Sequence, residues 1–589
     1  MASAALRMSN FFHHIKPYAI FLGTLLSAGV IVAYPLFDYD LYWHLANGRE
    51  MVAQRHIVNS EIFSYTRAGT PFVNHEWLAQ VVLFWIYQLW GGMGLNIFKV
   101  LMTLLTTAVL YRTCRMLTAG PCIASFLTLS AVLVCINRFN ARPELFSLVN
   151  LALLSYILHG YVHQRLSKRA LYFIPVIMVL WDWLHGAVYG VALLFAFASA
   201  ENIKHWLALR RGTNYSASPR LPSLNFWIAI TVVAMLLNPY GLLSYDIFIE
   251  FFRDNPLARR VGEFLPPSWE TNAPFWIFLS GSAVVVAASH KRLNITHLAV
   301  LIPFAALSLR YERATAIFAL VATPVLAILL PKLLDELKAL RSGPQLRTAL
   351  TLCAVATLAA YVIYVKLDTN KQNAFGFRVI ESGLPVGSAR FIQDVGLPGN
   401  MYNPGHFGGY LAFALAPQYK IFQYNHHTVF GDTLRFMDHP EELDQWHINY
   451  AIVTYANEIQ LLFPPAQWAS LYHENGASLL IRRSAENAEI IRDYETTYYQ
   501  PYRYSFDDFR RLAANPQVYP RLMHEMGTYL AYRRDPRVSA LFAELLAQAG
   551  NLLPTQLREH LVSRALRFNP ENGNLQQMLQ PRAGRLPSP

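Results

Sequence analysis

The chain carries few charged residues for its length. Asp, Glu, Lys and Arg make up 15% of its 589 residues, whereas about a quarter is usual in soluble proteins. The shortage is uneven, because long apolar runs fill residues 17–366 and ordinary charge returns after residue 367. This pattern excludes a single soluble globular domain. It predicts an α-helical polytopic membrane protein with a water-exposed C-terminal part.

Cysteine is also scarce, and its positions argue against two kinds of site. The four cysteines, Cys114, Cys122, Cys135 and Cys353, lie in or beside apolar runs. Neither a disulfide framework nor a zinc ribbon is expected from such positions. The net charge of +12 does not indicate a nucleic-acid partner either, because the bases lie between apolar runs rather than on one face.

About eleven segments have the length and composition of membrane spans, since a span needs about 20 mostly apolar residues. They are residues 17–36, 94–111, 121–137, 143–160, 171–184, 186–203, 225–238, 273–289, 294–309, 314–331 and 349–366. Lys and Arg collect in alternate loops, which is typical of cytoplasmic loops. We therefore expect a cytoplasmic N-terminus, a last span that exits outward, and an extracytoplasmic C-terminal domain, periplasmic in a Gram-negative cell.

The composition predicts four regions along the chain. The transmembrane domain covers residues 1–366. It includes a first outer loop, 37–93, in which three tryptophans and the pair Gly91-Gly92 indicate a helix at the membrane interface. Short apolar runs between Gly, Pro and Asn turns predict an α/β domain over 367–500. Residues 501–580 resemble a short tetratricopeptide-like helical segment, and 581–589 form a disordered tail.

Acidic and imidazole side chains gather in the first outer loop. Asp38 and Asp40 directly follow the first span, where nearby apolar surface raises a carboxyl pKa and suits a general base. His44 lies one helical turn after Asp40, and His75 and Glu76 close the loop. Asp38, Asp40, His75 and Glu76 could also bind a divalent cation such as Mg²⁺ or Mn²⁺. The alternative is that the acids cap a helix and the histidines form interfacial hydrogen bonds.

Arginines occur in two other outward connections. Arg138 and Arg142 lie between the third and fourth predicted spans, and Arg310 and Arg313 between the ninth and tenth. A guanidinium binds phosphate oxygens bidentately, so the four arginines are candidates for a donor phosphate. The alternative is that each pairs with Glu144, Glu312 or a lipid headgroup. His185, in the segment WDWLHG, is a further outward-facing candidate.

Several motifs together resemble the GT-C superfamily of polyprenyl-phosphate-dependent glycosyltransferases, and more closely an uncharacterised bacterial membrane-protein group in or near it. They are DYDLYWHL at 38–45, NHEWL at 74–78, RPE at 142–144, WDWLHG at 181–186, LNPYG at 237–241 and GGYL at 408–411. The resemblance implies an isoprenoid-phosphate donor, an acceptor bound under the outer domain, and an essential acid at Asp38 or Asp40. The chain departs from the pattern after GGYL, where QYNHH at 423–427 replaces an Asp-Gly-Arg-like strand end.

The resulting expectation is a glycosyltransferase at the outer face of a bacterial cytoplasmic membrane. It would move a sugar from a polyprenyl-phosphate-linked donor to a glycan, lipid or protein acceptor. One alternative is a transporter or flippase of lipid-linked sugars, although neither an internal repeat nor polar mid-membrane residues favour it. The other is a non-catalytic scaffold whose C-terminal helical segment binds an envelope protein.

Overall fold

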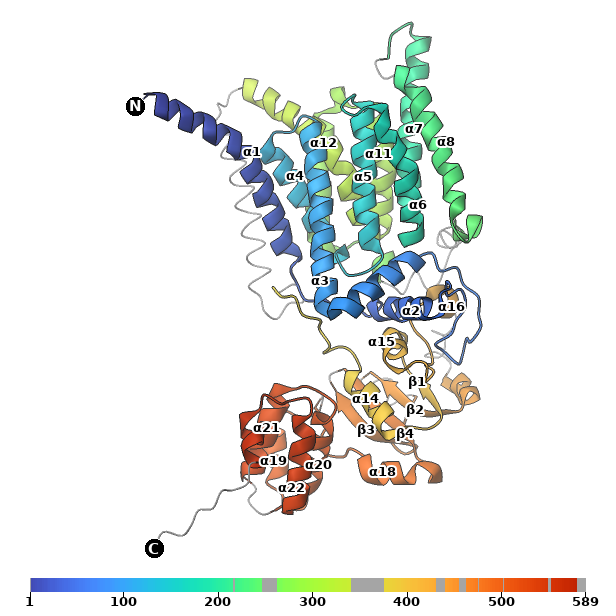
Figure 1. Cartoon of the computed structure of the whole chain (residues 1–589), viewed down its shortest axis with the longest axis vertical. Coiled ribbons are helices and arrows are strands. Elements are labelled where there is room, and N and C mark those ends of the chain that lie inside the picture. The colour runs from blue at the N-terminus through green and yellow to red at the C-terminus, as the bar shows by residue number, and fades with distance from the viewer. Residues whose placement is uncertain are drawn as a thin grey trace. The chain divides into compact units, whose positions relative to one another are not determined.

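A computed structural model describes residues 2–215, 218–245, 262–340, 375–430, 440–454, 462–474, 476–501, 503–548 and 552–579 (Figure 1). The predicted span 349–366 and the predicted tail 581–589 lie outside the described residues. The chain forms two compact units. The first comprises Met1–Asp38, Asn47–Asn59 and Val73–Val379, and the second comprises Tyr39–Ala46, Ser60–Phe72 and Ile380–Pro589.

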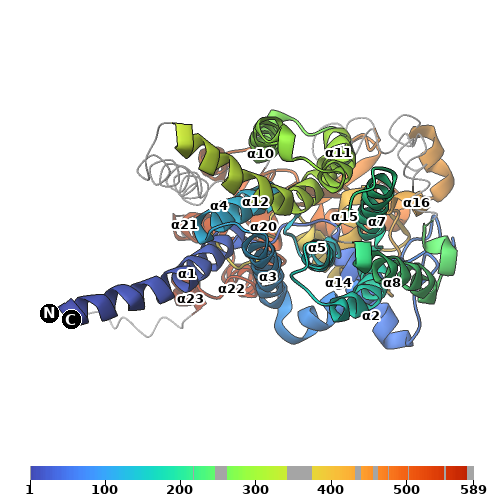
Figure 2. The same cartoon turned by 90° about the horizontal axis from the view of Figure 1, so that it is seen from above.

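The first unit is a bundle of apolar helices. Such helices satisfy their own backbone groups, which a segment inside a bilayer requires. Its helices are α1 (Ala2–Val32), α2 (Leu41–Gln54, whose first turns belong to the second unit), α3 (Trp77–Met116), α4 (Pro121–Val134), α5 (Glu144–Val162), α6 (Phe173–His185), α7 (Val188–Arg210), α8 (Leu221–Ala234), α10 (Trp269–Ala288), α11 (Ile295–Arg310) and α12 (Thr315–Leu340). Figure 2 shows this bundle from above.

Four stretches of the described residues are helical, long and apolar enough to cross a membrane: Trp77–Met116, Glu144–Val162, Gly262–Ala288 and Glu312–Glu336. Shorter apolar helices cover Pro17–Val32, Pro121–Val134, Leu221–Leu237 and Ile295–Arg310. Large apolar side chains are exposed on the outside of the bundle, among them Leu101, Phe173 and Val284. The apolar helices agree with the predicted membrane domain, while the number of spans stays a prediction.

Helix α3 changes direction at Gly91. This residue has φ 61° and ψ −157°, a conformation that favours glycine, so the chain bends there between two helical stretches (Figure 1). The first stretch is the tryptophan-rich segment for which a separate interfacial helix is predicted. The second packs against α5 and α1. Helix α12 is the central element, in contact with α4, α5, α10 and α11.

The second unit contains a four-stranded mixed sheet in the order β1-β2-β4-β3. Strand β1 (Asn400–Tyr402) pairs in parallel with β2 (Ile448–Val453), and β4 (Ala477–Arg482) is antiparallel to both β2 and β3 (Trp468–Glu474). The helices before β2 are α14 (Val386–Val395), α15 (Gly405–Leu415) and α16 (His427–Phe430), and α18 (Ala488–Tyr494) follows β4. A mixed α/β fold is therefore present in the region for which it is predicted.

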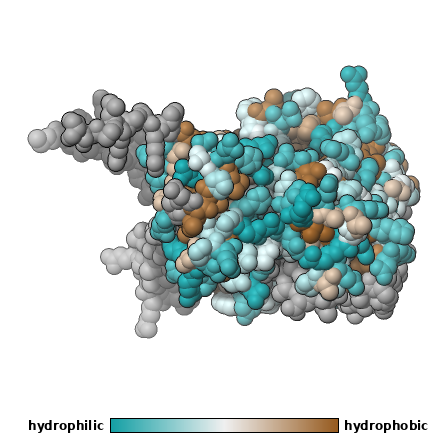
Figure 3. Space-filling model, turned by 90° about the horizontal axis from the view of Figure 1, so that it is seen from below, coloured by the Kyte–Doolittle hydropathy of each residue, from teal (hydrophilic) through white to brown (hydrophobic). Residues whose placement is uncertain are grey.

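Five further helices complete the second unit: α19 (Phe506–Ala513), α20 (Tyr519–Leu530), α21 (Pro536–Gln548), α22 (Thr555–Leu566) and α23 (Gly573–Leu579). They are joined to the sheet by a buried ion pair between Arg533 and Glu474. Glu474 also accepts hydrogen bonds from the backbone N–H groups of Gly387 and Ser388, at 3.0 and 2.8 Å. The face seen in Figure 3 is mostly hydrophilic. A tetratricopeptide-like nature of these helices stays a prediction.

Two pieces of the first outer loop belong to the second unit. Ser64 forms a parallel backbone bridge with Ile421, and Thr66 Oγ1 donates to the Phe422 carbonyl at 2.5 Å. Glu61 accepts hydrogen bonds from the N–H groups of Phe63 and Ser64 and from the Tyr424 hydroxyl, at 2.7, 2.6 and 2.5 Å. Residues 60–72 are thus an integral part of this unit.

The glycines of the GGYL motif permit close backbone approach. A Cβ at Gly408 would lie 1.9 Å from the Gln423 carbonyl oxygen, and one at Gly409 would lie 2.9 Å from the Tyr39 carbonyl oxygen. Both distances are too short for a side chain, so α15 reaches its neighbours only because these positions are glycine. The motif is explained by packing of α15 against the segments 39–46 and 423–424.

Candidate functional site

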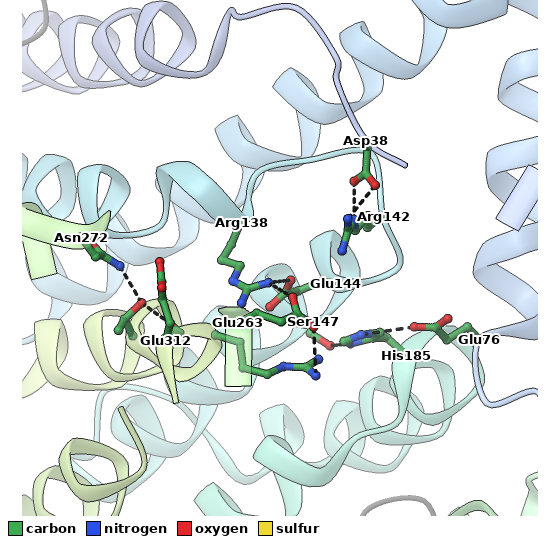
Figure 4. Close-up of polar contacts among 12 residues, drawn as sticks. Asp38, Glu76, Arg138, Arg142, Glu144, Ser147, His185, Glu263, Asn272 and Glu312 are labelled. Carbon is green, nitrogen blue, oxygen red and sulfur yellow. Dashed lines mark hydrogen bonds and ion pairs between the residues drawn. The ribbon is translucent and has the colours of Figure 1, made fainter. Parts of the chain in front are cut away.

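Asp38 and Arg142 form a bidentate ion pair in the first unit. Asp38 lies in the connection after α1, and Arg142 lies in the turn before α5. Arg142 Nη2 donates to Asp38 Oδ1 at 2.6 Å, and Arg142 Nε donates to Oδ2 (Figure 4). The Asp38 side chain is buried, whereas Arg142 is partly exposed. One of the predicted acids is therefore held by one of the predicted arginines through two charge-assisted hydrogen bonds.

Arg138 also faces carboxylates. It lies in the short 3₁₀ turn Ile136–Arg138 and contacts Glu144 at 3.3 Å and Glu263 at 2.9 Å. Arg313 lies 3.6 Å from the other oxygen of Glu263. The expectation that these arginines pair with nearby acids agrees with the structure for Arg138 and Glu144. Arg310 makes a different contact, because its Nε donates to the Tyr311 hydroxyl at 3.1 Å.

A cavity of about 340 Å³ opens among these groups. Its lining comes from three connections of the first unit: Asn137, Arg138, Asn140, Arg142, Glu144, Gly262, Glu263 and Glu312. Two arginines face three glutamates, so the lining carries one net negative charge. A phosphate in this cavity would have to compete with Glu144 and Glu263 for Arg138.

Glu312 differs from the other acids of the cavity. In the part of the chain that the structure describes, its carboxylate has no hydrogen-bond or ion-pair partner. Its backbone is held, because its N–H donates to the Leu265 carbonyl at 2.8 Å and its carbonyl accepts from Thr315 Oγ1 at 2.7 Å. Asn272 Nδ2 donates to the same Thr315 oxygen at 3.1 Å (Figure 4). A fixed turn thus places Glu312 in the lining of the cavity.

A second polar group involves Glu76 and His185. Glu76 Oε1 lies 3.4 Å from His185 Nε2 and 3.7 Å from His75 Nε2. The Nδ1 atom of His185 lies 2.7 Å from Ser147 Oγ. Trp181 Nε1 donates to the same serine oxygen at 2.6 Å. Three residues of the predicted set therefore meet, together with Trp181 of the WDWLHG motif and with Ser147, which lies in none of the motifs.

The segments WDWLHG and LNPYG are tied to each other. Asn238 Nδ2 donates to Asp182 Oδ2 at 2.8 Å, and the Tyr245 hydroxyl lies 3.4 Å from Asp182 Oδ1. Asn238 Oδ1 also accepts the N–H of Tyr240 at 2.9 Å, as in a turn closed by an asparagine side chain. This network holds α6 and the turn after α8 together, which fixes the helix that carries His185.

Asp40 and His44 belong to the second unit, at the start of α2. The His44 N–H donates to the Asp40 carbonyl at 3.3 Å, so the two residues are one helical turn apart, as predicted. His44 is buried and its ring lies 4.4 Å from that of Trp43. Trp43 also packs against His426, which lies in the segment QYNHH at 423–427. The departing segment therefore contributes to an aromatic cluster.

Two of the predicted metal ligands, Asp38 and Glu76, lie against charged or imidazole side chains. Asp38 is bound by Arg142, and Glu76 lies beside His75 and His185. Across the described ranges, no three His, Cys, Asp or Glu side chains are grouped so that they could hold a metal ion. A cation site formed by Asp38, Asp40, His75 and Glu76 stays a prediction, because Asp40 belongs to the second unit and the other three residues to the first.

No protein-family model and no curated protein matches the chain. Among solved structures, the oligosaccharyltransferase AglB from Archaeoglobus fulgidus, in complex with an inhibitory peptide and a dolichol-phosphate, aligns at a TM-score of 0.54 and 12% identity. That alignment covers 92% of this chain and 86% of AglB. The apo form of the same enzyme aligns at a TM-score of 0.52 and 12% identity, over 81% of this chain and 75% of the other.

ArnT from Cupriavidus metallidurans bound to undecaprenyl phosphate aligns at 13% identity over 80% of this chain and 99% of ArnT, with a lower TM-score of 0.46. The likeness to AglB covers most of both chains. The chain therefore shares the fold of AglB, which agrees with the fold that the resemblance of its motifs implies. At 12% identity this likeness establishes a shared fold and not a shared reaction.

Proposed function

We propose that the protein is a membrane glycosyltransferase that uses a polyprenyl-phosphate-linked sugar at the outer face of a bacterial cytoplasmic membrane. The observation that carries this proposal is a cavity lined by arginines and carboxylates in a helical bundle with the GT-C fold. The solved structure of AglB, which shares the fold, is a complex with an inhibitory peptide and a dolichol-phosphate. A lipid-linked donor and a separate acceptor are therefore the substrates proposed here.

The chemistry is a nucleophilic displacement at the anomeric carbon. The acceptor nucleophile gives its proton to a carboxylate while its bond to the anomeric carbon forms. The bond from that carbon to the phosphate oxygen breaks, and the polyprenyl phosphate leaves with the electron pair. Asp40 is the proposed base, with Asp38 the second candidate. His44, His75 and Glu76 would assist or orient.

The arginines would stabilise the leaving phosphate. Arg138 and Arg142 line the cavity, and Arg313 is linked to it through Glu263. Their present carboxylate partners hold them in position, and the donor phosphate would displace one of these partners on binding. Arg310, which contacts Tyr311, is the weakest of the four candidates. No step is assigned to a metal ion.

The test is sugar transfer by the full-length protein in membranes, read by mass spectrometry of glycolipids and glycoproteins from cells with and without the gene. Asp40→Asn should lower transfer by about a hundredfold or more while the protein remains folded in the membrane, because the base is removed. Asp493→Asn is the matched control, since Asp493 is exposed on α18. Unchanged glycoconjugates in the gene deletion would reject the enzyme. Normal transfer by the Asp40 variant would reject that residue as the base.

The scaffold alternative needs a point-mutation test. Deleting residues 505–589 would remove Arg533 and leave Glu474 buried without its cation, so loss of a partner after that deletion would also follow from unfolding. Substituting exposed residues of α21 and α22 keeps the ion pair. If such variants lose an envelope partner and keep transfer, the helices serve binding and the site serves catalysis.

A further inference from the structure

Four side chains from three segments form a continuous polar series in the first unit. Trp181 and His185 lie one turn apart on α6, Ser147 lies on α5, and Glu76 precedes α3. The successive distances are 2.6 Å from Trp181 Nε1 to Ser147 Oγ, 2.7 Å from that oxygen to His185 Nδ1, and 3.4 Å from His185 Nε2 to Glu76 Oε1. Figure 4 shows His185 between Ser147 and Glu76.

The chemistry of the first member sets the direction of the hydrogen bonds. An indole N–H only donates, so Ser147 Oγ accepts from Trp181. The serine proton is then free to be donated to His185 Nδ1, which makes Nδ1 the acceptor of a neutral imidazole. The ring proton of that tautomer is on Nε2, the nitrogen nearest Glu76. The three donors therefore form a directed series, and its last N–H, on His185 Nε2, faces the Glu76 carboxylate.

We propose that Trp181, Ser147 and His185 form a positioning relay that fixes the Glu76 carboxylate in one orientation. Hydrogen bonds arranged in series strengthen one another. The use of the relay in sugar transfer rests on the proposed function. There, a fixed Glu76 accepts a hydrogen bond from a substrate hydroxyl and orients the substrate. Ser147 and Trp181 act through His185 and are positioning residues.

Two other roles for these residues disagree with the geometry. Ser147 is completely buried and already accepts from Trp181, so it is not placed to attack a substrate. Glu76 occupies the N-cap position of α3, yet its side chain makes no capping hydrogen bond. A capping carboxylate would accept from the N–H groups of the first helical turn. Glu76 instead faces the imidazoles of His185 and His75.

The relay adjoins the cavity through α5. Ser147 follows Glu144 by three residues on this helix, so the two side chains lie on the same face. Glu144 lines the cavity, and Ser147 supports His185 one turn further along. A change at Ser147 can therefore alter Glu76 without removing a side chain that lines the cavity.

The tautomer of His185 tests the relay without any substrate. Long-range ¹H–¹⁵N correlation spectra of the full-length protein in detergent micelles, with ¹⁵N-labelled histidine and His185→Gln for assignment, distinguish a protonated Nε2 from a protonated Nδ1. We expect Nε2–H in the native protein and in Ser147→Thr, which keeps the hydroxyl. Ser147→Ala should give a mixture. Ser155→Ala is the control, because Ser155 is buried on the same helix. A protonated Nδ1 in the native protein, or an unchanged spectrum in Ser147→Ala, would overturn the relay.

The kinetics of sugar transfer test whether the relay serves the reaction. Lipid-linked sugars extracted from the source membranes are the donor. Ser147→Ala should lower kcat about tenfold at unchanged KM for the donor, the loss expected for one buried hydrogen bond. Ser147→Thr should restore the rate. His185→Gln can place an amide N–H near Glu76, whereas His185→Asn can reach only Ser147, so the Gln variant should keep more activity. The reverse order would overturn the positioning role. Absence of transfer in the native protein would reject the proposed function, and the spectra would still decide the relay.

Discussion

The two units bury ion pairs in different surroundings. In the second unit, Glu474 and Arg533 have side chains that are 0% and 9% exposed, and Glu474 accepts two backbone N–H groups besides. In the first unit, the partners Arg138 and Glu263 have side chains that are 11% and 29% exposed, and both line the cavity of about 340 Å³. The fully buried pair of the second unit, the sealed pair, can hold elements together but cannot contact a ligand. An open pair can exchange its partner for one.

The largest effect is expected from opening the sealed pair. Arg533→Ala leaves Glu474 buried without its cation, which should destabilise the second unit by about 3–5 kcal/mol. Hydrogen exchange of peptides that cover β3 and β4, measured on the full-length protein, reports this unit directly. Arg534→Ala is the control, because Arg534 is exposed in its pair with Glu571 and should contribute about 1 kcal/mol or less. Equal effects of the two variants would remove the contrast between the units.

Acid should also weaken the second unit through His473. Burial lowers the pKa of His473 to about 4 from an ordinary value of 6.5. The unfolded state therefore binds a proton at a pH where the folded state does not, and stability falls as the pH decreases from 6.5 to 4. Over the range from pH 6.5 to 4, the free energy of unfolding should fall by about 3 kcal/mol. Hydrogen exchange of β3 should lose part of its pH dependence in His473→Gln. An unchanged dependence would mean that His473 titrates normally.

Close packing of the GGYL motif should give a smaller effect. In Gly408→Ala the new Cβ would lie 1.9 Å from the Gln423 carbonyl oxygen, so the backbone must shift. We expect a loss of about 1–3 kcal/mol in the second unit. Gly573→Ala is the control, because no atom lies within 4 Å of its Cβ position. Thermal unfolding monitored by tryptophan fluorescence would compare the stabilities of the two variants. A Gly408→Ala protein as stable as the control would refute the packing explanation.

The smallest effect on stability is expected for Glu312→Gln. Since this carboxylate has no partner among the described residues, its neutralisation should change stability by about 0.5 kcal/mol or less. Sugar transfer should nevertheless fall if the cavity receives the substrate. Glu474→Gln should behave in the opposite way, with a large loss of stability and no direct effect on the site. A large destabilisation by Glu312→Gln would mean that the Glu312 carboxylate has a structural role.

Local composition was sufficient to predict the apolar helices and the mixed α/β region, because both follow from short-range patterns. The partners of the site residues were harder to predict. Arg142 meets Asp38 across 104 positions of sequence, and nothing local to either residue specifies that contact. Glu263 was missed because it stands in a connection with no motif. Ser147 was missed because a serine in an apolar helix is usually structural.

The first outer loop divides between the two units. The predicted transmembrane domain includes residues 37–93 as this loop, and segments 39–46 and 60–72 lie in the second unit. The loop was read from its charges and histidines, which carry no information on strand pairing. The glycines that allow α15 to approach Tyr39 were visible in the sequence, but their partner was not. Long-range pairing of this kind needs the folded structure.

The hydrogen bond between Glu61 and Tyr424 has a consequence for biosynthesis. These residues are 363 positions apart, and the membrane helices are made between them. During synthesis the early loop therefore emerges long before its partners exist, and its buried carboxylate and backbone groups must wait in water or on a chaperone. A ribosome that stalls anywhere in the helical bundle leaves this half-unit exposed.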